Sequence, residues 1–233
     1  MAAEQDKQLA LGASDRIELL ATIVMAAAAI LTAWAAFQSS KWSGVQAIEY
    51  SSANAARIES TRLDTQAGQL TSIDVDVFLS WLEAVQSELD RGLEVVTDDG
   101  YVPLEGTLSA FFYERMRDEF RPALDTWLAD RPLLNPDAPA TPFDTGEYEL
   151  EAARAADDKL SEASEHTSLA LDANQNSDSH VLVAVALALA IFFAGVSSKL
   201  EARRNRWIAI ALATLIFLGA AATLAALPKV SPF

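Results

Sequence analysis

The sequence predicts an all-α membrane protein in which three transmembrane helices carry an extracytoplasmic helical bundle. Two observations predict this fold class. Three segments of membrane-spanning length lack charged residues except for one glutamate at an edge. The segment between the first two, residues 38–180, shows apolar residues at helical spacing and is long enough for a domain with its own core.

The composition excludes several other classes of protein. The chain has 233 residues, of which 51% are hydrophobic and 21% charged, and it contains no cysteine. This excludes a disordered chain, a disulfide-stapled domain, a thiolate metal site and a cysteine nucleophile. The formal charge of −16 also argues against nucleic acid as a partner, because phosphates would repel most of the molecule.

The predicted transmembrane helices cover residues 17–37, 181–198 and 207–227. At about 1.5 Å per residue they rise roughly 27 to 32 Å, which matches a hydrocarbon core of about 30 Å. Tryptophan rings favour the headgroup level, and three of them are predicted interface anchors. These are Trp34, Trp42 and Trp207.

Basic residues in a short turn predict the orientation. The turn 199–206 carries Lys199, Arg203, Arg204 and Arg206. Short loops rich in lysine and arginine stay in the cytoplasm. We therefore expect a plasma-membrane protein with a cytoplasmic N-terminus, residues 1–16, and with residues 38–180 and the tail 228–233 outside. Residues 38–180 hold 10 basic and 28 acidic groups, so nearly all the acidity is predicted to be extracytoplasmic.

The first apolar segment could instead be a cleaved signal peptide, since Ala33-Trp34-Ala35 has the form that a signal peptidase accepts. Its N-terminal flank is not basic, and its apolar run exceeds the usual length of about 7 to 15 residues. Both features favour a retained anchor.

The outer segment is predicted to be helical throughout. The first span continues as a helix to about Gln69, and a second helix begins near Ser72, where hydroxyls offer an N-cap. A third stretch, 107–130, is interrupted by Pro122, which predicts a kink or a helix restart with Pro122 in the first turn. Four prolines make 131–146 an irregular crossover.

A last helix is predicted to begin at 144–147 and to pass without a breaker into the second span. Its small residues recur near a period of 3.5, which is typical of a coiled coil.

The stretch AWAAFQSSKWSGVQA, residues 33–47, resembles the hallmark of a widespread family of uncharacterised prokaryotic membrane proteins with three spans. The similarity continues in FRPALDTWL (120–128), NPDAP (135–139) and FFAGVSSK (192–199). The resemblance implies the same topology, and it transfers no catalytic or binding role to any residue.

The candidate metal ligands are few. His166 and His180 lie 14 residues apart and could share one stripe of a helix, but a metal site needs three or four ligands. The acidic loop Asp98-Asp99-Gly100 could hold Ca²⁺ but lacks the ligand spacing of an EF-hand, so a polar turn with a left-handed glycine is favoured. No metal site, cofactor or catalytic residue is predicted, and an enzyme is not expected.

Other polar and aromatic features have ordinary structural interpretations. Asp74 and Asp76 point about 200° apart on a helix and are interpreted as surface residues. Arg121 is expected to be neutralised by Asp125, one turn away, while Arg117 contributes to a basic spot. Eight aromatic residues between 101 and 148 could line a pocket, but their helical spacing favours the bundle core.

Two functional hypotheses follow. The favoured one is a non-enzymatic scaffold or sensor-like interaction protein that meets a protein partner through its outer helical domain and self-associates through small-residue transmembrane faces. The alternative is an oligomeric channel or transporter subunit with an acidic outer vestibule. The spans contain no ionisable group at mid-membrane, which disfavours an ion-coupled carrier.

Overall fold

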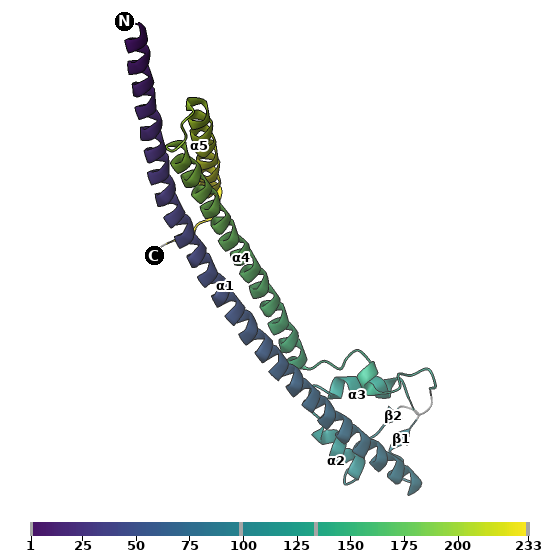
Figure 1. The fold of residues 1–233 in the computed structure, drawn as a ribbon. Helices are drawn as coiled ribbons and strands as arrows, with labels where there is room; N and C mark the ends of the chain where they lie inside the picture. The colour runs from purple at the N-terminus through teal and green to yellow at the C-terminus, as the bar shows by residue number, and fades with distance from the viewer. Residues whose placement is uncertain (1, 98–99, 133–134, 232–233) are drawn as a thin grey trace. The chain divides into compact units, whose positions relative to one another are not determined.

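The computed structural model describes residues 2–97, 100–132 and 135–231, with side chains from residue 16 onward. Its chain divides into two compact units (Figure 1). The membrane unit comprises residues 1–53 and 165–233, and the outer unit comprises residues 54–164. The predicted all-α fold class is confirmed, and three helices are long and apolar enough to cross a membrane.

The three helices of the membrane unit contain the predicted spans. They are the first part of α1 (Ala2–Asp90), the second part of α4 (Glu151–Ser197) and α5 (Arg203–Ala226). α1 is continuous through Gly44, as expected from the absence of proline. α4 likewise passes through residues 180 and 181 without a break.

The buried side chains of the membrane unit form two clusters, and each cluster contains residues of all three predicted spans. At one end Ile17 and Ala21 of α1 pack with Ala194 of α4 and Ile210 of α5. Toward the other end Ala28 and Ala35 pack with Val183, Leu187 and Leu224. Small alanines at these contacts allow close helix approach, while the outward faces carry exposed leucine, isoleucine and phenylalanine, which suits a lipid surface.

A polar layer follows the apolar contacts along α1 and α4. The Ser177 hydroxyl lies 2.9 Å from the Ser39 hydroxyl and 3.0 Å from that of Ser43. Gln38 is fully buried, donates to the Val230 carbonyl and accepts from the Val230 amide. The chain after α5 is therefore held against α1 at the end of the predicted first span.

The outer unit is built on the last part of α1 and the first part of α4. Between them lie a hairpin of β1 (Val96–Thr97) and β2 (Gly100–Tyr101), then α2 (Leu108–Arg115), α3 (Arg121–Ala129) and the 3-10 turn η1 (Pro142–Asp144). α3 begins with Pro122 in its first turn, as predicted, because proline fixes a helical φ and needs no donor there. The expected crossover contains only η1 among its described residues, so its irregular character is confirmed.

Two predicted helix boundaries are wrong. α1 does not stop near Gln69, because the Thr71 and Ser72 hydroxyls donate to the carbonyls of Ala67 and Gly68 instead of capping a new helix. α4 begins at Glu151 rather than at 144–147. The Glu119 carboxylate accepts the Glu151 amide, so the cap comes from a distant segment.

Candidate functional site

The outer unit has an aromatic core made by α1, the hairpin and α3. Phe78 lies at its centre, with its ring centroid 5.3 Å from that of Trp127 and 6.1 Å from that of Phe143. Both contacts are edge-to-face, the arrangement that the ring quadrupoles favour. The core interpretation of the 101–148 aromatics is confirmed for most of them, while Phe111 is exposed. Trp81 of α1 is a core member that the sequence analysis did not single out.

A buried polar network closes the side of this core next to α4. Asp74 is only 2% exposed, so its interpretation as a surface residue is wrong. Its carboxylate accepts from the Tyr148 hydroxyl at 2.8 Å and lies 3.7 Å from the Arg117 guanidinium. Arg117 also pairs with Glu119. The predicted basic spot at Arg117 is therefore neutralised within the fold, and the network joins α1 to the segment before α4.

Burial dominates the electrostatics of this network. Desolvation raises the pKa of Asp74, and the Tyr148 hydrogen bond and the Arg117 charge only partly oppose it. Burial, reinforced by the nearby carboxylate, raises the pKa of Tyr148 to about 12. At neutral pH Tyr148 is thus a hydrogen-bond donor that holds Asp74 in place.

Asp125 does not pair with Arg121 as predicted. Its carboxylate accepts from the Tyr113 hydroxyl at 2.7 Å, while Arg121 donates to the Glu114 and Met116 carbonyls. Burial and the hydrogen bond to Asp125 raise the pKa of Tyr113 to about 12. This contact ties α2 to α3 across the bend between them.

A buried carboxylate also caps α2. Glu88 is 3% exposed and accepts from both the amide and the hydroxyl of Ser109, at 3.0 and 2.5 Å. The Tyr101 hydroxyl in turn donates to Ser109. A negative group at a helix N-terminus satisfies free amides and interacts well with the helix dipole. The cap fixes the hairpin and α2 against the end of α1.

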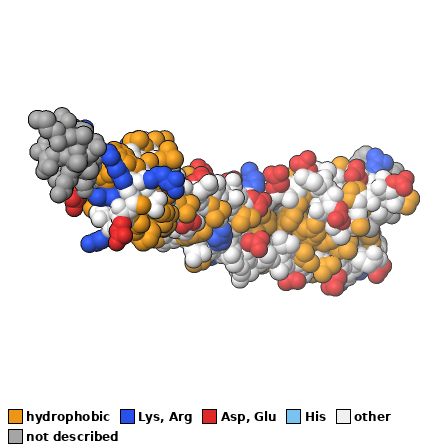
Figure 2. Space-filling view, turned by 45° about the horizontal axis from the view of Figure 1, so that its top comes forward, with side chains coloured by type: hydrophobic (Ala, Val, Ile, Leu, Met, Phe, Trp, Pro, Cys, Tyr) orange, Lys and Arg blue, Asp and Glu red, His pale blue; other side chains and the backbone are white. Residues whose placement is uncertain are grey.

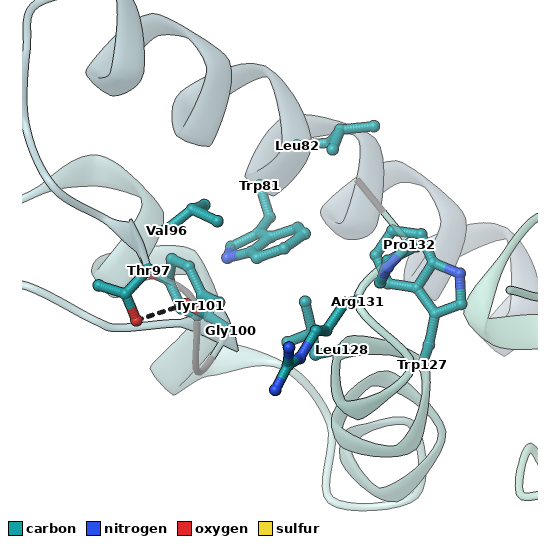
Figure 3. Close-up of a pocket in the computed structure, with 10 residues that line it drawn as sticks. All are labelled: Trp81, Leu82, Val96, Thr97, Gly100, Tyr101, Trp127, Leu128, Arg131 and Pro132. Atoms are coloured by element: carbon teal, nitrogen blue, oxygen red, sulfur yellow. Dashed lines mark hydrogen bonds between the residues drawn. The ribbon is translucent and has the colours of Figure 1, made fainter. Parts of the chain in front are cut away.

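These supports frame a pocket between α1, the hairpin and α3 (Figure 3). Its walls are mainly aromatic and aliphatic. Ten residues line it: Trp81, Leu82, Val96, Thr97, Gly100, Tyr101, Trp127, Leu128, Arg131 and Pro132. Its enclosed part has a cavity volume of about 20 Å³. Since roughly 10 to 15 Å³ of such volume holds one water molecule, the pocket admits a slender group.

Polar groups around the pocket are few. The Trp127 indole N–H donates to the Pro139 carbonyl at 2.7 Å. The Trp81 indole N–H is buried and makes no hydrogen bond of normal geometry in the described residues, although it is near enough to help lower the pKa of Tyr101. Burial outweighs that effect and raises the Tyr101 pKa. In Figure 3 the Trp81 nitrogen lies on the side of the hairpin.

Arg131 is the cation of the pocket lining and has an unusual backbone. Its φ of 54° lies in the left-handed region, which costs a residue with a Cβ about 1 kcal/mol. It follows the C-cap of α3, where glycine is the usual choice. Figure 3 shows its side chain extended beside Leu128. No ion pair holds its guanidinium within the described parts of the chain.

The two histidines lie apart in the membrane unit. His166 Nδ1 is 2.6 Å from the Glu49 carboxylate, and fully buried His180 contacts the Asn176 carbonyl through Nδ1. Among the described side chains no group of three ligand-type residues surrounds either histidine. Of the acidic loop, Asp98 and Asp99 lie outside the described residues, and Gly100 has the expected positive φ, 114°.

All three predicted interface anchors lie on helices of the membrane unit. Trp34 is exposed and packs on Phe37, and Trp207 is exposed on α5. Trp42 donates its indole N–H to the Pro228 carbonyl at 3.2 Å, so it also holds the chain that follows α5.

The basic turn is shorter than predicted. α5 begins at Arg203, so Arg203, Arg204 and Arg206 stand in its first turn and only Lys199 lies between the helices. Cations at a helix N-terminus are disfavoured by the helix dipole. Figure 2 shows several lysine and arginine side chains gathered at one place on the visible face of the molecule.

Comparisons with protein-family models, with curated proteins and with solved structures find no match for this chain. The resemblance suggested by residues 33–47 therefore stays a prediction, and the pocket must be interpreted from its own chemistry.

Proposed function

We propose that the chain is a non-enzymatic, sensor-like interaction protein of the plasma membrane, with its outer unit outside the cell. Three apolar helices support insertion, and the four basic residues at 199–206 support a cytoplasmic location for that turn. The strong acidity of residues 38–180 suits the opposite, water-exposed side.

The observation that carries the recognition role is the apolar pocket of the outer unit. Three aromatic side chains form part of its walls, and the Glu88 cap and the aromatic core hold them in place. A concave, pre-formed apolar site with few polar groups is the typical geometry of a binding site. Its position in the outer unit makes it accessible to a partner or ligand outside the cell.

Self-association through the spans is part of the proposal. Gly219, Ala222 and Ala226 are exposed on one face of α5, and nothing lies within 4 Å of a Cβ built at Gly219. Such small-residue faces allow helices of neighbouring protomers to approach closely in lipid.

Hydrogen exchange on the full-length protein in lipid nanodiscs tests the recognition role. The protein is exposed to small-molecule and protein fractions of the medium in which its own host grows. We expect one fraction to slow exchange in segments 81–101 and 127–132. Leu128→Arg, which places a charged side chain in the pocket wall, should abolish the protection, whereas Leu160→Arg on exposed α4 should not.

Protection by no fraction, together with cation flux in liposomes, would contradict the proposal and favour the channel hypothesis. Cross-linking of single cysteines at Gly219 tests the self-association. A protein that stays monomeric in nanodiscs and gives no cross-link at position 219 would exclude self-association through α5.

A further inference from the structure

We propose that the pocket beside Arg131 binds a small carboxylate with a slender apolar tail. This proposal rests on the recognition role given above and names the ligand class of the same site. Arg131 is an exposed cation at the wall of a mainly apolar pocket, and it has no ion pair in the described residues. A guanidinium pairs with a carboxylate through two parallel hydrogen bonds, which gives it both affinity and orientation.

The backbone of Arg131 supports a ligand role for its side chain. The position after α3 needs a left-handed residue, and glycine adopts that conformation without strain. An arginine here adds strain and gains no ion pair within the described residues. Strained residues of this kind cluster at ligand sites, because the bound group benefits from the enforced geometry.

The shape and polarity of the pocket define the rest of the ligand. The enclosed space of about 20 Å³ has room for the end of one aliphatic chain and not for a bulky ring system. Trp81, Leu82 and Val96 offer only aromatic and aliphatic contacts for that chain.

The charge of the surroundings selects among anions. Residues 38–180 carry 10 basic and 28 acidic groups, so a doubly charged phosphate ester is repelled more strongly than a monoanion. An amino acid is disfavoured because no acidic side chain among the described lining residues can pair with its ammonium group. The aromatic walls would suit a quaternary ammonium ion, but Arg131 opposes a cation.

Calorimetric titration of the full-length protein in nanodiscs tests this assignment. The probe is hexanoate, and hexanamide, acetate and hexyltrimethylammonium are the comparison compounds. We expect hexanoate to bind at least about tenfold more tightly than hexanamide, which has the same tail without charge, and acetate not to bind measurably. A dodecanoate titration distinguishes a membrane-derived acid from a short free acid as the source of the carboxylate.

The decisive variant is Arg131→Gly, which removes the guanidinium and also relieves the left-handed strain. Its melting temperature should equal or exceed that of the unchanged protein, so a loss of hexanoate binding by about tenfold or more cannot come from unfolding. Arg131→Lys should keep part of the affinity. Arg154→Ala, which removes an exposed cation from α4, should leave binding unchanged and serves as the charge-matched control.

Equal binding of hexanoate and hexanamide, unchanged binding in Arg131→Gly, or preferred binding of hexyltrimethylammonium would each overturn the carboxylate assignment. Absence of hexanoate binding while a protein fraction protects segments 81–101 and 127–132 from exchange would overturn it and leave the recognition role standing. Absence of hexanoate binding together with absence of protection by any fraction would contradict the recognition role itself.

Discussion

At the scale of single residues, the outer unit depends on buried oxygens whose partners lie far away in the sequence. Asp74 meets Tyr148, and Glu88 meets Ser109. Local sequence could not reveal either contact, because an acidic residue on a helix is usually a surface residue. The left-handed backbone of Arg131 could not be predicted from local sequence either, since it depends on where α3 ends.

The Tyr113 hydroxyl should titrate near pH 12, and Asp125→Asn should lower its pKa by part of the shift. Burial is the larger cause and remains in the variant, while the carboxylate is removed. Because the folded pKa lies above the usual value of 10, this group stabilises the protein below pH 10, and that contribution is lost as the pH rises through 12. Ultraviolet titration compared with Tyr113→Phe measures the change. An unchanged titration in Asp125→Asn would contradict the assigned hydrogen bond.

Glu88→Ala should destabilise the outer unit by about 1 to 3 kcal/mol, because the Ser109 amide and hydroxyl lose their buried acceptor. Glu83→Ala removes an exposed carboxylate from the same helix and should change stability by less than about 0.5 kcal/mol. Denaturant unfolding followed by tryptophan fluorescence gives both values. Equal effects of the two substitutions would mean that Glu88 does not cap α2.

At the scale of elements, apolar periodicity and proline placement predict most helices, because these signals are local. The three apolar helices and the restart of α3 at Pro122 follow from such signals. Helix ends are harder to predict because the capping groups are distant. Glu119 caps α4 at Glu151, and the hydroxyls of residues 71 and 72 bond backward along α1. The hairpin at 96–101 was missed although Asp-Gly is a turn signal.

Gly44→Ala should stabilise the membrane unit by about 1 kcal/mol, because Gly44 lies inside α1 with a helical φ and open space around a new Cβ. Gly100→Ala should destabilise the outer unit, since its φ of 114° disfavours a residue with a Cβ. Thermal unfolding in nanodiscs compares the two. Destabilisation by Gly44→Ala would indicate that the helix bends at this position.

At the scale of the whole molecule, the division between an apolar membrane unit and an acidic outer segment follows from composition. Hydropathy identifies the three helices that are long and apolar enough to cross a membrane, because lipid imposes length and polarity directly on the sequence. The candidate pocket could not be predicted, since its walls come from segments about 50 residues apart. Trp81 and Trp127 meet there only after the chain folds.

The first span should be retained in the mature protein. Ala35, which lies at the possible cleavage site, is fully buried among residues of α4 and α5 such as Val183 and Leu224. Mass spectrometry of protein purified from membranes should therefore find peptides covering 17–37. A mature N-terminus at Ala36 would leave only two spans and would contradict the packing of the membrane unit.

The orientation of the chain is the most direct test of the central claim that the outer unit faces the outside of the cell. Single cysteines are introduced at exposed Ser161 and at exposed Asn205 in this cysteine-free chain, and intact cells are treated with an impermeant maleimide. We predict labelling at position 161 and, until the cells are permeabilised, none at position 205. Labelling at 205 but not at 161 would invert the topology and contradict the account.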